Sequence, residues 1–142
     1  MRFPTALSTA FLGLALLELS CSLLLARPAL AQQGTKTVVG EMTDEDPALN
    51  PEGHPFDAYG FAGVAETPVT ITLTSPDYDT YMILFFEGEE GLEEIARSDN
   101  MSAESTDSEL FGTLPRTGQY RIVMTTAQST GRGTYRLTVE GL

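Results

Sequence analysis

Apolar and polar residues alternate in short runs along most of the chain after residue 55. Val69, Ile71 and Leu73 alternate with threonines, and the segments 120–125 and 135–140 repeat the pattern. A period of two places alternate side chains on opposite faces of a β-strand. The segment 81–86 is instead continuously apolar, which predicts a central strand covered on both faces. The pattern therefore predicts a chain built from strands.

Turn-forming residues separate these runs, and shorter strands are predicted at 95–98 and 109–113. Short strands at such regular spacing predict an all-β fold, an antiparallel β-sandwich of about 7–8 strands. Only Glu89–Ala96 has the composition for a single turn of helix. The expected turns are Gly63–Pro68, Ser75–Asp79, Gly88–Gly91, Pro115–Gly118 and Ser129–Gly133. The expected core residues are Tyr59, Phe61, Val69, Ile71, Leu73, Ile83, Phe85, Tyr120, Ile122, Tyr135, Leu137 and Val139.

The first 31 residues have a different composition from the rest. They include 20 apolar residues, ten of them leucine, and Ala29 and Ala31 form the small-x-small pattern of a signal-peptidase site. We therefore predict that 1–31 is a cleaved signal peptide and that the product is exported to the periplasm, cell surface or medium. An uncleaved anchor is the first alternative, although the apolar stretch 10–26 is shorter than the ~20 residues of a spanning helix. A lipoprotein attached through Cys21 is the second, although Glu18 departs from the lipobox.

The charge and the cysteine and histidine content of the chain exclude several kinds of partner and site. Cleavage after Ala31 leaves 19 acidic and 6 basic residues, no cysteine and one histidine. A surface this acidic argues against a nucleic-acid partner, because phosphate neutralisation needs clustered Lys and Arg. No disulfide can form, and a multi-histidine metal site is excluded. Residues 32–55 are predicted to be an acidic Pro/Gly-rich segment with a possible first strand at 37–42, and 56–142 the sandwich domain.

The order of several short motifs resembles the bacterial pre-peptidase C-terminal (PPC) domain. The matching segments are Asp57-x-Tyr59-x-Phe61-x-Gly63, Pro68–Ser75, Asp79–Leu84, Ile95–Asn100, Ser108-x-Leu110, Leu114–Ile122 and Gly133–Val139. The resemblance implies a jelly-roll-like sandwich that is non-catalytic and usually appended to secreted peptidases. No peptidase domain precedes these segments here. We therefore expect a stand-alone, exported binding or accessory module with no cofactor, whose partner is a secreted peptidase or another envelope protein.

Two other functions stay open, a calcium- or carbohydrate-binding module and a structural cell-envelope protein. Loop residues Asp77, Asp79, Asp99, Asn100, Glu104 and Asp107 offer the oxygen ligands that Ca²⁺ prefers, without EF-hand spacing. Asp57 and Asp79 each begin an apolar strand, and we expect backbone N–H groups to satisfy their carboxylates. The chain has no Trp for a sugar platform, and Tyr78 is the aromatic ring expected to be exposed.

Three remaining motifs have structural interpretations. Leu114–Gly118 spells the sortase motif LPxTG, but 24 residues with strand patterning follow it, so we interpret it as a turn entering a strand.

Glu87–Glu94 holds five acids and is predicted to be a solvated hairpin tip, with a docking patch for a basic partner as the alternative. His54 has no accompanying nucleophile motif, and a chain this small offers little cleft for paired carboxylates, so no catalytic residue is predicted.

Overall fold

The computed structural model describes residues 34–142, and the predicted signal peptide, including Cys21, lies outside them. Eight strands form and no helix lies among the described residues, so the all-β prediction is confirmed. Within this part of the chain no helix is long and apolar enough to cross a bilayer. The strands are β1 (Thr35–Met42), β2 (Phe56–Gly63), β3 (Pro68–Thr74), β4 (Thr80–Gly88), β5 (Gly91–Ser98), β6 (Ser108–Thr113), β7 (Gly118–Thr126) and β8 (Gly133–Glu140).

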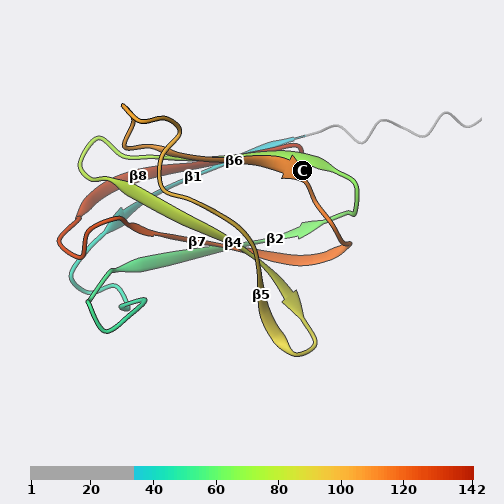
Figure 1. Cartoon of the computed structure of the whole chain (residues 1–142), viewed down its shortest axis with the longest axis horizontal. Coiled ribbons are helices and arrows are strands. Elements are labelled where there is room, and N and C mark those ends of the chain that lie inside the picture. The colour runs from blue at the N-terminus through green and yellow to red at the C-terminus, as the bar shows by residue number, and fades with distance from the viewer. Residues whose placement is uncertain (1–33) are drawn as a thin grey trace, which may run out of the picture.

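The strands form two four-stranded sheets, ordered β1-β8-β3-β6 and β2-β7-β4-β5. All strand pairs are antiparallel, and the two sheets form the two layers in Figure 1. The first strand pairs with the last and the second with the seventh, as in an eight-stranded jelly roll. The expected antiparallel jelly-roll-like sandwich is therefore the observed fold.

The core lies between the two sheets and is filled by the alternating apolar residues. Ile71, Leu73 and Leu137 come from one sheet, and Tyr120 and Ile122 from the other; all five are fully buried. Each lies on the strand face that the period of two predicts. Alternation in the sequence therefore determines which side chains stabilise the fold by leaving water.

The phase predicted for β4 was wrong. Met82, Leu84 and Phe86 pack in the core, which leaves Ile83 and Phe85 on the outer face. A continuously apolar run has no alternation from which the inward set could be identified. The outer face is nevertheless partly covered, since Ile83 is only 8% exposed. Leu49 and His54, from the loop before β2, line the same hollow as Ile83.

The single helical turn considered for Glu89–Ala96 does not form. Gly88 pairs with Gly91 across a tight turn, and β5 begins at Gly91 with a φ of 119°. Glycine adopts such a φ readily, so the chain reverses there. Pairing with β4 then satisfies the backbone of this segment, which overrides its helical composition.

Candidate binding site

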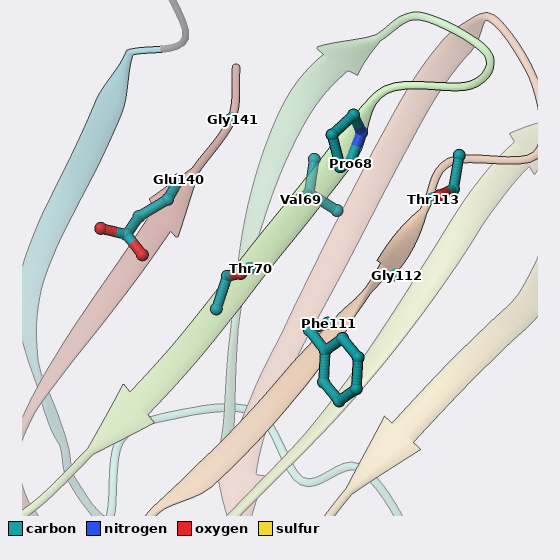
Figure 2. Close-up of a pocket in the computed structure, with 8 residues that line it drawn as sticks. All are labelled: Pro68, Val69, Thr70, Phe111, Gly112, Thr113, Glu140 and Gly141. Carbon is teal, nitrogen blue, oxygen red and sulfur yellow. The ribbon is translucent and has the colours of Figure 1, made fainter.

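A shallow groove of about 430 Å³ crosses the outer face of the β1-β8-β3-β6 sheet. Thr70 of β3 forms its floor, and its register partners are Phe111 of β6 on one side and Glu140 of β8 on the other. Figure 2 shows the Phe111 ring and the Glu140 carboxylate on opposite sides of Thr70. Pro68 and Thr113 lie beside this row. The groove therefore places an aromatic ring, hydroxyl groups and a carboxylate along one line.

Phe111 is the residue that stands out in this groove. It is 82% exposed, and it is the only exposed Phe or Tyr among residues 34–142. Its neighbour Leu110 packs against the core, so the strand period directs Phe111 outward. Because β6 is an edge strand, no further strand of the sheet shields the ring. Aromatic side chains are enriched in protein interfaces, so this exposed ring beside the groove makes the groove a candidate recognition surface.

Glu140 is exposed and makes no ion pair with any residue of the described part of the chain. Arg97, Arg116, Arg121 and Arg132 are each paired with another carboxylate. The groove therefore carries a negative charge that is available to a ligand.

Thr70, Phe111 and Glu140 were not among the site residues predicted from the sequence. Strand alternation after the apolar Leu110 could have placed Phe111 on the outer face, but only strand pairing shows that Glu140 lies in the same row. The aromatic ring expected to be exposed, Tyr78, is instead buried. Its hydroxyl has no hydrogen-bond partner among residues 34–142.

The acidic segment Glu87–Glu94 forms the tip of the β4–β5 hairpin, which projects beyond the sandwich in Figure 1. Glu93 pairs with Arg116 at 2.6 Å and Glu87 with Arg121 at 2.6 Å. Glu94 pairs with Arg97 of the same strand. Arg116 also stacks 4.1 Å from the centre of the Phe86 ring. Three of the five acids are therefore engaged by arginines, and only Glu89 and Glu90 at the turn have no ion pair within residues 34–142.

The sortase-like segment Leu114–Gly118 forms the turn into β7. Leu114 is buried, and the buried Tyr120 hydroxyl donates to the Arg116 carbonyl at 2.6 Å. The same hydroxyl accepts from the Arg116 N–H at 3.1 Å. These bonds fix the turn that holds Arg116 over Phe86.

Asp57 lies half-buried on the inner face of β2, as its alternation predicts. Its partner is a side chain rather than the backbone N–H groups that we expected, because the Tyr135 hydroxyl donates to it at 2.7 Å. Burial raises the pKa of Tyr135 well above its usual value, and the hydrogen bond to Asp57 is the second-largest cause of this shift. Burial also raises the pKa of Tyr78, and the charge of Asp57 adds to the effect.

Two of the six calcium-ligand candidates accept hydrogen bonds from neighbouring residues. Asp77 accepts from Thr134, and Asp107 accepts from the Ser75 N–H. Asp79 lies beside Asn100. With the Asn100 side-chain amide turned so that its nitrogen faces Asp79, this nitrogen donates to Asp79 Oδ1 at 3.2 Å. Burial, with a smaller effect from Asp99, raises the pKa of Asp79. No three His, Cys, Asp or Glu side chains in residues 34–142 lie close enough together to hold a metal. Calcium binding by these loop residues stays a prediction.

His54 is mostly buried against the end of β7. Its Nδ1 lies 2.9 Å from the Thr126 carbonyl oxygen, and Nε2 lies 3.5 Å from Glu52. These contacts attach the loop before β2 to the outer face of the β2-β7-β4-β5 sheet. They give His54 a structural role.

No family model matches the chain, and no curated protein matches it. Several solved structures do resemble it. The pre-peptidase C-terminal domain of collagenase from Bacillus anthracis is 20% identical, with a TM-score of 0.56, and the match covers 74% of this chain and 88% of that one. PliG from Aeromonas hydrophila, a periplasmic lysozyme inhibitor of g-type lysozyme, is 17% identical, with a TM-score of 0.56, over 77% of this chain and 87% of that one. The Yersinia pseudotuberculosis-derived mitogen is 16% identical, with a TM-score of 0.56, over 78% of this chain and 87% of that one. At these identities the likenesses establish the shared fold.

Proposed function

We propose that this chain is an exported, non-catalytic binding module, similar to the PPC domain, that docks on a secreted or envelope protein. The observation that carries the proposal is the exposed Phe111 ring beside the groove. Aromatic side chains are enriched at protein interfaces because they bury a large area at low entropic cost.

Two kinds of support come from outside the groove. The similar structures include a domain of a collagenase and an inhibitor of a lysozyme, so this fold serves proteins that act beside or on an enzyme. The one histidine of the described residues is held by a backbone carbonyl and supports a loop. Both observations favour an accessory role over catalysis.

Affinity capture from the periplasm and the growth medium tests this proposal. The tagged full chain would be exported in its host as the wild type, Phe111→Ser and Val39→Ser. Val39 is a matched control because it is also exposed and apolar, and lies on β1, two strands away from β3 on the same sheet. We expect one stoichiometric protein partner with the wild type and the control, and at least ~10-fold less with Phe111→Ser, as for a hot-spot residue. Equal recovery by Phe111→Ser, or no partner in either compartment, would contradict the proposal.

A further inference from the structure

We infer that the groove over Thr70 holds a cationic side chain, an arginine or a lysine, of the partner protein; this inference rests on the proposed function. Phe111, Thr70 and Glu140 form one row across β6, β3 and β8. Adjacent strands lie about 4.8 Å apart, so the backbones at the two ends of the row are separated by roughly 10 Å across the sheet. The apolar stem of a long cationic side chain would lie against the ring while its charged end reaches the carboxylate.

The chemistry of the row is selective for a cation. The ring offers a surface for the apolar stem, and the unpaired carboxylate attracts the charged end and accepts a charge-assisted hydrogen bond from it. The hydroxyls of Thr70 and Thr113, which line the groove, can accept further N–H bonds. Among residues 34–142, no positively charged side chain lines the groove, so none of them competes with an incoming cation.

The molecule already contains one such arrangement. Phe86 and Glu93 are register partners on β4 and β5, and together they hold Arg116. The Arg116 guanidinium lies 4.1 Å from the Phe86 ring centre and 2.6 Å from Glu93. The groove presents the same two kinds of group, Phe111 and Glu140, with one strand between them, and no arginine within residues 34–142 is paired with Glu140.

The charge of the whole domain favours the same kind of partner. Residues 34–142 contain 19 acidic and 6 basic residues. Such an excess attracts basic proteins over distances up to the Debye length and raises their association rate. A basic partner would thus be steered to the molecule and anchored at the groove.

The test is a titration of the ¹⁵N-labelled, signal-free chain, followed by NMR. The probe is acetyl-Gly-Arg-Gly-amide, and the matched neutral probe replaces arginine with citrulline, which has the same shape without the charge. We expect the arginine peptide to shift the amide signals of Thr70, Gly112 and Gly141, and the citrulline peptide to shift them little. Glu140→Gln and Phe111→Leu should each weaken binding by about twofold to fivefold.

Glu41→Gln serves as the control. Glu41 of β1 is the register partner of Thr134 on the same sheet, and it lies outside the groove. This substitution removes the same charge and should leave the affinity unchanged. Equal binding of both peptides, shifts confined to the β4–β5 hairpin, or equal weakening by Glu41→Gln would overturn the inference. So would shifts of the groove amides with an N-acetylglucosamine oligosaccharide and none with the arginine peptide. Such a failure would leave the capture of a partner through Phe111 intact, so the inference and the proposed function can fail separately.

Discussion

At the scale of single residues, two buried tyrosines differ in one bond. Tyr135 donates to Asp57, whereas the Tyr78 hydroxyl is buried without a partner in the part of the chain that the structure describes. A buried hydroxyl is favourable only when its hydrogen bond is made, because desolvation otherwise outweighs it. The two side chains therefore make opposite contributions to stability through the same chemical group.

The matched substitutions Tyr135→Phe and Tyr78→Phe test this difference. We expect Tyr135→Phe to lower the free energy of unfolding by about 1–3 kcal/mol, because it leaves the half-buried Asp57 carboxylate without its donor. Tyr78→Phe should leave that free energy unchanged or raise it by up to about 1 kcal/mol, because it removes an unsatisfied group. Urea unfolding of both variants measures the difference. Equal destabilisation by both would contradict the assignment of the hydrogen bonds.

The same tyrosines predict how stability depends on alkaline pH. Burial raises the pKa of both in the folded state, whereas in the unfolded chain they ionise near pH ~10. Above about pH 10 the unfolded state therefore loses protons that the folded state keeps, and stability falls with pH. The slope should approach about 1.4 kcal/mol per pH unit for each tyrosine, and Tyr78→Phe should remove one tyrosine's share. Urea titrations from pH 8 to pH ~11.5 measure it; a slope that Tyr78→Phe leaves unchanged would contradict the prediction.

At the scale of the strands, alternation predicted β2, β3, β7 and β8 with the correct inward faces. It was not informative for β4, whose run from Tyr81 to Phe86 is apolar at every position. It also did not reveal the candidate groove, because that row depends on β3 lying between β6 and β8. Pairing between strands distant in sequence is a property of the folded chain that a local period of two does not contain.

Replacing two strand glycines by alanine should change the free energy of unfolding in opposite directions. A Cβ at Gly112 of β6 would enter open space, whereas a Cβ at Gly40 of β1 would collide with the Tyr135 ring. We expect Gly112→Ala to raise the free energy of unfolding by about 0.4–1 kcal/mol, through lower entropy of the unfolded chain. Gly40→Ala should lower it by about 1–3 kcal/mol through overpacking. Thermal and urea unfolding compare the two variants, and a destabilised Gly112→Ala would show that β6 packs differently.

At the scale of the whole molecule, the jelly roll determines which surfaces are available. The loop before β2 lies against one end of the β2-β7-β4-β5 sheet, through His54 and Leu49. The outer face of the β1-β8-β3-β6 sheet carries the groove instead. The net negative charge is a second property of the whole molecule, and it follows from composition alone.

The excess of acidic residues predicts a dependence on salt. Self-repulsion destabilises a compact state of high net charge, and salt screens it. We expect the thermal midpoint to rise by a few degrees between about 20 and 500 mM NaCl. Replacing Glu89 and Glu90 together by Gln should raise the midpoint at low salt and reduce its dependence on salt, because neither makes an ion pair in residues 34–142. A midpoint that falls as salt is added would mean that the surface ion pairs outweigh the repulsion.

The most direct measurement of the central claim is hydrogen–deuterium exchange of the wild-type chain, free and bound to its captured partner. Docking on the groove predicts new protection in Val69–Thr72, Leu110–Thr113 and the C-terminal residues 140–142, with the tip of the β4–β5 hairpin unchanged. Protection confined to that hairpin or to the loop before β2, with the groove strands unchanged, would contradict the account.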